Sequence, residues 1–236
     1  MKILAIVVAA AAIQGCAFTD ARLDVRNSPT ATYKGPMSSV EPTSFTVAPL
    51  ADERPDKQRI GNKRNGFGQK TADITTTNLV TAIVADGVKA GLQRNGHSIA
   101  GTGDVKITGA VTRFWFEVDP NMFTVDFTGN IECKLEFADA KSGAKIYSST
   151  YTGTNKKTTG GGLEATWTEV MNTAVDKLVE DVVFDADLVE ALQARRVPAP
   201  APASDQAPAP ATAPAPASPM PPPTPAPAPA SNTPKT

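Results

Sequence analysis

The feature that most constrains the fold is residues 123–137, where apolar and polar side chains alternate almost without interruption. Successive side chains of a β-strand point to opposite faces, so this pattern predicts one buried face and one solvated face. Asp139 and Ser142-Gly143 then supply turn residues, and residues 144–154 return as the partner strand of a hairpin. The buried face consists of Phe123, Val125, Phe127, Ile131, Cys133, Leu135 and Phe137.

Two amphipathic helices are predicted on either side of these strands. Residues 71–95 form the first, which ends before Gly96, and residues 163–184 form the second, which can continue to Gln193. Gly87 and Gly91 lie near the apolar stripe of the first helix and predict close packing on the sheet. The stripes contain Val80, Ile83, Val84, Val88 and Leu92 in the first helix, and Trp167, Val170, Met171, Ala174, Val175, Leu178 and Val182 in the second.

Adding strands at residues 44–50 and 105–116 gives the order strand, helix, three strands, helix. A strand joined through a helix to another strand of the same sheet makes a right-handed crossover, and hairpins add antiparallel neighbours. The predicted fold class is therefore α+β: a two-layer sandwich with a mixed, mostly antiparallel four-stranded sheet and two helices on one face.

The amino-terminal end is typical of a secretory signal. Lys2 precedes an apolar run at residues 3–13, which is too short for a membrane-spanning helix of about 20 residues. The run ends in Ile13-Gln14-Gly15-Cys16, which resembles the lipobox of bacterial lipoproteins. This resemblance implies cleavage after residue 15 and lipid on Cys16, and Ala17 in the next position implies sorting to the outer membrane. The alternative is an ordinary signal that contains a cysteine by chance.

The rest of the chain divides by composition. Residues 16–43 are predicted to form a lipidated cysteine and a mostly irregular tether, with room for a short strand at 22–26. Residues 44–193 are predicted to form one globular domain. In residues 197–236, 15 of 40 residues are proline, so this tail can bury little and is predicted to be disordered. It is either a spacer or a ligand for a proline-binding partner or the cell wall.

The sequence contains few residues that could catalyse a reaction or bind a metal. His97 is the only histidine, and no serine or cysteine motif accompanies it, so we expect a packed or solvated side chain and no enzyme. If Cys16 carries lipid, Cys133 has no disulfide partner and is better explained as a small buried hydrophobe than as a reactive thiol. No cofactor is expected. With one histidine and a lipidated Cys16, any metal site would rest on carboxylates, whose only dense run lies along the second helix, so no metal is expected. No nucleic-acid partner is expected either, because the chain without residues 1–15 has 22 basic against 24 acidic side chains.

One stretch of positive charge stands out. Five cations lie in residues 57–70 with no acid between them, and glycines separate them. This run predicts a flexible basic loop that holds lipid phosphates, an acidic wall polymer or an acidic partner. The alternative is a solvated connection balanced by the nearby acids of residues 52–56 or by the acidic second helix. The five candidate contact residues are Lys57, Arg59, Lys63, Arg64 and Lys70.

Residues 44–185 contain several short motifs, among them Asp52-Glu53-Arg54, Ile60-Gly61-Asn62, Asn65-Gly66-Phe67-Gly68, and Leu92 with Asn95-Gly96 at the end of the first helix. Together these motifs resemble the YajG family of bacterial lipoproteins. The layout is also similar, more distantly, to the amino-terminal domain of TolB and to lipoproteins that activate penicillin-binding proteins, which act by binding other proteins. Asp52 and Arg54 match the family pattern, which implies a structural ion pair at the sheet edge or a ligand-binding role.

Two function classes follow from these observations. The first is a noncatalytic envelope lipoprotein, anchored in the outer membrane and facing the periplasm, whose domain binds or helps assemble a cell-envelope protein complex. The second is a carrier of a small apolar ligand or lipid, which would use the apolar face of the long strand near Trp115 and Phe123.

Overall fold

The computed structural model describes residues 18–28 and 34–195 of the 236-residue chain, all within the first of its two units, residues 1–197. The predicted signal, Cys16 and the proline-rich tail therefore lie outside the described residues. In the two described ranges, no helix combines the length and the apolar character needed to cross a membrane.

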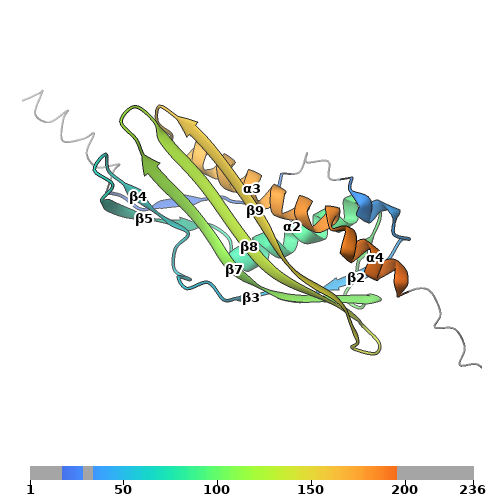
Figure 1. Cartoon of the computed structure of the whole chain (residues 1–236). Coiled ribbons are helices and arrows are strands. Elements are labelled where there is room, and N and C mark those ends of the chain that lie inside the picture. The colour runs from blue at the N-terminus through green and yellow to red at the C-terminus, as the bar shows by residue number, and fades with distance from the viewer. Residues whose placement is uncertain (1–17, 29–33, 196–236) are drawn as a thin grey trace, which may run out of the picture. The chain divides into compact units, whose positions relative to one another are not determined.

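Three long antiparallel strands dominate the fold: β7 (Val105–Pro120), β8 (Val125–Asp139) and β9 (Lys145–Thr159) (Figure 1). The alternation that predicted β8 is confirmed, since Phe127 through Phe137 keep their odd-numbered apolar side chains at most 2% exposed. The pattern overestimates the buried face at its start. Phe123 lies in the turn before β8 and Val125 is only partly buried.

Short strands pair along the other edge of β7. The segments β2 (Ser44–Val47), β3 (Ala51–Asp52) and β4 (Gly61–Arg64) lie parallel to β7 one after another. Strand β5 (Lys70–Thr76) pairs antiparallel with β4, and β1 (Ala21–Leu23) and β6 (Ser98–Ile99) pair parallel with β5 and β2.

Counted over the described residues, the sheet has nine strands and is mixed. The α+β class is confirmed, but the predicted four-stranded, two-layer sandwich is wrong. Most of the added strands are two to four residues long, too short for a period-two pattern to identify them. The first helix was also predicted to start too early: residues 70–76 form a strand that buries Ala72 and Ile74 on one face.

The α-helices among the described residues are α2 (Val80–Arg94), α3 (Glu164–Phe184) and α4 (Ala186–Ala194). Helix α3 lies directly on β8 and β9, because a Cβ added at Gly129 would be 3.2 Å from the Cβ of Ala174, and one at Gly153 would overlap the Ala174 carbonyl oxygen. The predicted close approach at Gly91 exists, but its partner is Val179 of α3 and not the sheet. Asp185 separates α3 from α4 and caps the latter by accepting backbone N–H groups.

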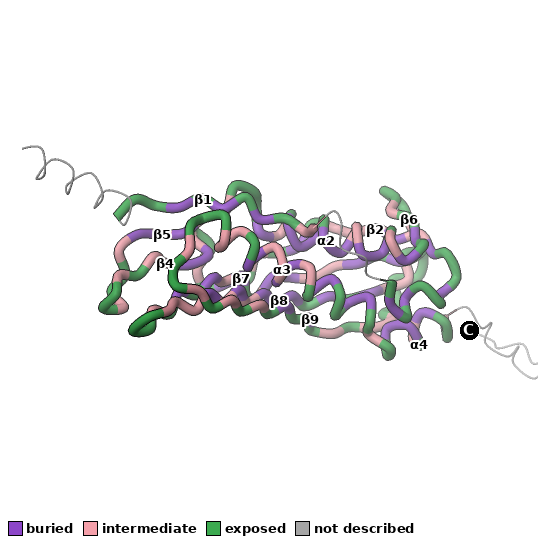
Figure 2. The backbone as a smooth tube through the Cα atoms, turned by 90° about the horizontal axis from the view of Figure 1, so that it is seen from above, coloured by how far each residue is buried: buried purple, intermediate pink, exposed green. Residues whose placement is uncertain are grey.

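The segment predicted as a tether contributes to the folded domain. Strand β1 joins the sheet, Val25 and Met37 are fully buried, and Figure 2 shows the buried positions of β1 beside β5. His97 is packed against the 3-10 helix η2 (Pro36–Ser39): its Nδ1 accepts the Thr43 N–H and its Nε2 lies 3.1 Å from the Met37 carbonyl oxygen. The domain thus begins before residue 44, and little chain separates it from Cys16.

Candidate functional site

The loop between β3 and β4, residues 53–60, leaves the edge of the sheet at an irregular place. Asp52 pairs with Val111 and Gly61 with Phe116, so the loop needs more residues than the β7 segment beside it. Strand β7 has a register shift between Val111 and Arg113 on its β8 side. Bulges of this kind redirect side chains and are frequent near functional sites.

Arg54 holds this loop together from within. Its side chain is only 5% exposed; Nε and Nη2 donate to the two carboxylate oxygens of Asp52, both at 2.9 Å. The same guanidinium donates to the carbonyl oxygens of Lys57, at 3.2 Å, and Arg59, at 3.1 Å. The pKa of Asp52 is lowered, chiefly by the hydrogen bond from Arg54. The two residues that resemble the YajG pattern therefore form an ion pair that joins both ends of the loop.

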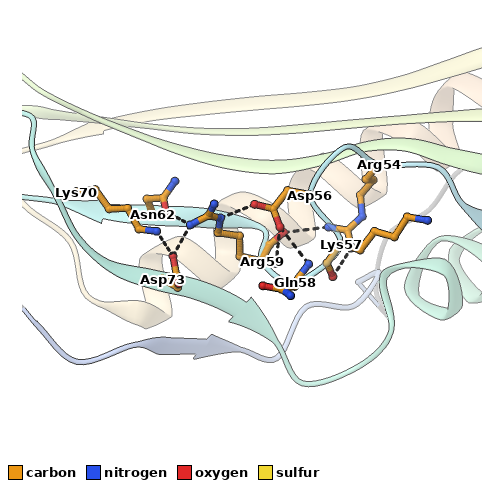
Figure 3. Close-up of polar contacts among 8 residues, drawn as sticks. All are labelled: Arg54, Asp56, Lys57, Gln58, Arg59, Asn62, Lys70 and Asp73. Atoms are coloured by element: carbon orange, nitrogen blue, oxygen red, sulfur yellow. Dashed lines mark hydrogen bonds and ion pairs between the residues drawn. The ribbon is translucent and has the colours of Figure 1, made fainter.

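A second ionic cluster continues from the loop into the neighbouring hairpin (Figure 3). Arg59 donates to Asp56 and, at 3.0 Å, to Asp73 of β5, which also accepts from Lys70 at 2.7 Å. The pKa of Asp73 is lowered by its hydrogen bonds from Lys70 and Arg59, in that order of size. Four charges thereby connect the β3–β4 loop to the β4–β5 hairpin.

The predicted basic loop is not one flexible segment, because it contains β4 and the start of β5. Lys63 lies 3.7 Å from Glu164 of α3 and 5.5 Å from the ring centroid of Trp167. Arg59, Lys63 and Lys70, three of the five cations, therefore lie next to protein carboxylates. This agrees with the alternative interpretation from the sequence, in which acidic side chains of the protein balance these charges. Lys57 and Arg64 are exposed and make no ion pair within the described residues. For these two cations, contact with a partner or an anion remains a prediction.

Beside the loop lies a groove of about 520 Å³, lined by Pro55, Arg113, Trp115 and Glu132 among others. Phe116, the next residue in β7, packs against Trp167 of α3, so Trp115 faces the side of the sheet away from the helices. Thr112, in the bulge, donates to Glu132 at 2.6 Å. The sequence-based prediction assigned Trp115 to the apolar face of the sheet, which is wrong. It also missed Arg113 and Glu132 as residues of a groove, because a β-bulge has no recognisable pattern in the local sequence.

The other features considered as candidate sites are buried in the core. Cys133 is a buried free cysteine, and burial raises the pKa of its thiol to about 12. The apolar face of β8 is filled by core side chains, including those of α3. Within the described ranges, no three His, Cys, Asp or Glu side chains gather in a way that could hold a metal ion.

A family model, Lipoprotein_16, described as an uncharacterized lipoprotein, matches residues 44–193. The chain belongs to this family of lipoproteins. The match covers the sheet from β2 to β9, helices α2 and α3, and α4 except for its last residue, and β1 and η2 lie before it. None of the curated proteins matches the chain significantly.

Several solved structures are similar at low sequence identity. A protein from Xanthomonas campestris, of the DUF330 family, is 13% identical over 75% of this chain and 98% of its own, with a TM-score of 0.49. A protein from Caulobacter crescentus, proposed to be a lipoprotein, is 14% identical over 70% and 98%, with a TM-score of 0.37. PelC from Paraburkholderia phytofirmans, crystallised as a dodecamer, is 15% identical over 64% and 95%, with a TM-score of 0.32.

Proposed function

We propose that this protein is a noncatalytic, YajG-like lipoprotein of the outer membrane, and that its periplasmic domain binds a protein of a cell-envelope complex. The observation that carries the proposal is the Trp115 groove on the face of the sheet away from the helices. Lipid on Cys16 would hold this groove near the membrane, where it could recruit or position its partner.

The composition of the groove favours a protein partner. Tryptophan and arginine are among the residues most enriched in those that dominate binding energy at protein interfaces, and Trp115 and Arg113, two residues apart in β7, both line the groove. Pro55 adds a rigid apolar surface. The Arg54 ion pair fixes the adjacent loop before any partner arrives, which lowers the entropy cost of binding.

The carrier alternative finds less support. It requires an accessible apolar face on β8, whereas Ile131, Leu135 and Phe137 are at most 2% exposed in the core. Phe123, which the carrier was expected to use, lies in an exposed turn. An enzyme has less support again, because both ring nitrogens of His97 contact protein groups and Cys133 is buried.

A photo-crosslinking amino acid placed at Trp115 in intact cells tests the proposal. We expect a discrete crosslinked envelope protein from position 115 and none from a control at Lys89, which is on the outer surface of α2. Trp115→Ala should also reduce co-purification of that protein while leaving the unfolding midpoint of the domain almost unchanged. Identical products at the two positions, or none at 115, would count against a binding groove.

A further inference from the structure

Exposed apolar side chains gather at one end of the domain. Within the described residues, seven large hydrophobic side chains are exposed, and five of them lie at this end. They are Phe18 at 68% exposure, Phe67 at 92%, Met122 at 89%, Phe123 at 84% and Leu163 at 81%. Single exposed hydrophobic residues are common on soluble proteins, but a cluster at one end marks an interaction surface.

Strand register places Met122, Phe123 and Leu163 together. Pro120 pairs with Val125, so the turn at residues 121–124 closes β7 and β8 at this end. Val125 also pairs with Thr159, so β9 ends there too and the connection to α3 carries Leu163. Figure 1 shows the β7–β8 turn and the end of β9 side by side.

The same reasoning places the remaining two side chains. Strand β4 continues parallel to β7 beyond the Gly61–Phe116 pair, which brings the β4–β5 hairpin tip, with Phe67, to this end. Strand β1 is parallel to β5, so Phe18 precedes it at the level of the tip. Both figures show the start of β1 beside this hairpin. Thr19, Asn65, Val118 and Leu163 line one groove of about 740 Å³, which confirms that these segments meet.

We propose that this end, defined by Phe18, Phe67, Met122, Phe123 and Leu163 and here called the apolar end, docks on the surface of a lipid bilayer. The chain itself points to this occupant. Only Ala17 separates Phe18 from Cys16, so even a fully extended chain allows at most about 7 Å between the Cα atom of Phe18 and that of the residue predicted to carry the lipid. The other end is far from the anchor: Arg195, the last described residue, pairs with Asp139 at the opposite end of β8.

The cations near the apolar end do not favour lipid phosphates as the main attraction. Lys156 pairs with Asp126 at 2.8 Å and Lys157 with Glu169 at 2.7 Å, in addition to the pairs of Lys63 and Lys70. Arg64, which lines the same groove, makes no ion pair within the described residues, so one cation here is left to contact a lipid phosphate. Docking then depends mainly on apolar insertion at the depth typical of interfacial segments, about 5–10 Å.

Depth-dependent quenching tests the proposal on the lipidated protein. Phe67→Cys, Phe123→Cys and, as a control, Ser142→Cys in the β8–β9 turn at the opposite end are each labelled with an environment-sensitive fluorophore. Cys133 is buried and does not compete for the label. On phosphatidylcholine vesicles that contain nitroxide lipids, we expect quenching at positions 67 and 123 but not at 142. Equal exposure to water at all three positions would overturn the proposal and would favour a protein partner for this end.

A second measurement is independent of the lipid on Cys16. The mature chain with Cys16→Ser is mixed with vesicles of phosphatidylcholine, with and without phosphatidylglycerol, and the bound fraction is measured by flotation. We expect weak binding that falls about tenfold for each of Phe67→Ser and Phe123→Ser and changes little with phosphatidylglycerol. Leu79→Ser removes a side chain that is 76% exposed away from this end, and should have no effect. An equal loss with Leu79→Ser, or binding only to phosphatidylglycerol, would contradict apolar docking.

Discussion

Arg54 and Asp52 are two residues apart in sequence and form a bidentate ion pair, in which the guanidinium is almost completely buried. The geometry explains why both residue types are needed. Only a planar guanidinium can bind both carboxylate oxygens and still reach the carbonyl groups of Lys57 and Arg59. The pair therefore shapes the loop that forms one wall of the Trp115 groove.

Removal of this guanidinium should destabilise the domain. Arg54→Ala leaves the Asp52 carboxylate and two loop carbonyls without their donor, and we expect a loss of about 2–4 kcal/mol in the free energy of unfolding. Arg54→Lys keeps the charge but loses the planar fork, so it should recover only part of the loss. Urea unfolding measures both. If Arg54→Ala and Asp52→Ala both leave the midpoint unchanged, the pair has no structural role.

The same pair should make stability depend on acid. The pKa of Asp52 is lowered in the folded state by the Arg54 hydrogen bond, so the unfolded chain takes up this proton first as pH falls. Its contribution is complete above the unfolded pKa and is lost as pH falls from about 4 through the lower folded pKa. We expect Asp52→Asn to flatten the decline in melting temperature below about pH 4. A decline as steep as that of the unchanged protein would show that other carboxylates cause it.

The contact between α3 and β9 should be intolerant of an added methyl group. At Gly153, a Cβ would overlap the carbonyl oxygen of Ala174, which is backbone and cannot rotate away. Gly153→Ala should therefore destabilise the domain by about 1–3 kcal/mol or more. Gly160→Ala is the matched control, because nothing lies within 4 Å of the added carbon. Thermal melting of the two variants should differ clearly, and equal melting temperatures would mean that α3 is not pressed against the strand.

Cys133 should not react while the domain is folded. Its thiol is buried and desolvation raises its pKa to about 12, so almost no thiolate exists at pH 8 and reagents have no access. A chromogenic disulfide reagent at that pH should modify Cys133 only after urea is added, in parallel with the loss of tertiary structure. Modification of the native protein at the rate of a free thiol would contradict the core position.

Sequence alone determined the long strands and most of both long helices. The alternation of β8 and the apolar stripe of α3 are periodic over many residues, and such periods depend only on local geometry and on which side chains avoid water. The break between α3 and α4 at Asp185 was within reach as well, because an aspartate that caps a helix is a local signal. The signal and lipobox at residues 1–16 remain predictions from sequence.

Tertiary structure alone decided which distant residues meet. Strands β2 and β3 exist because β7 offers them a hydrogen-bonding edge, and β4 exists because it pairs with β5; segments of so few residues carry no period of their own. Asp73 and Glu164 balance cations that sequence order had left without acids, since each pairing depends on the register of strands and on where α3 begins. The apolar end also forms in this way: four separate turns and segments carry one or two exposed side chains each, and only the mixed sheet brings them together.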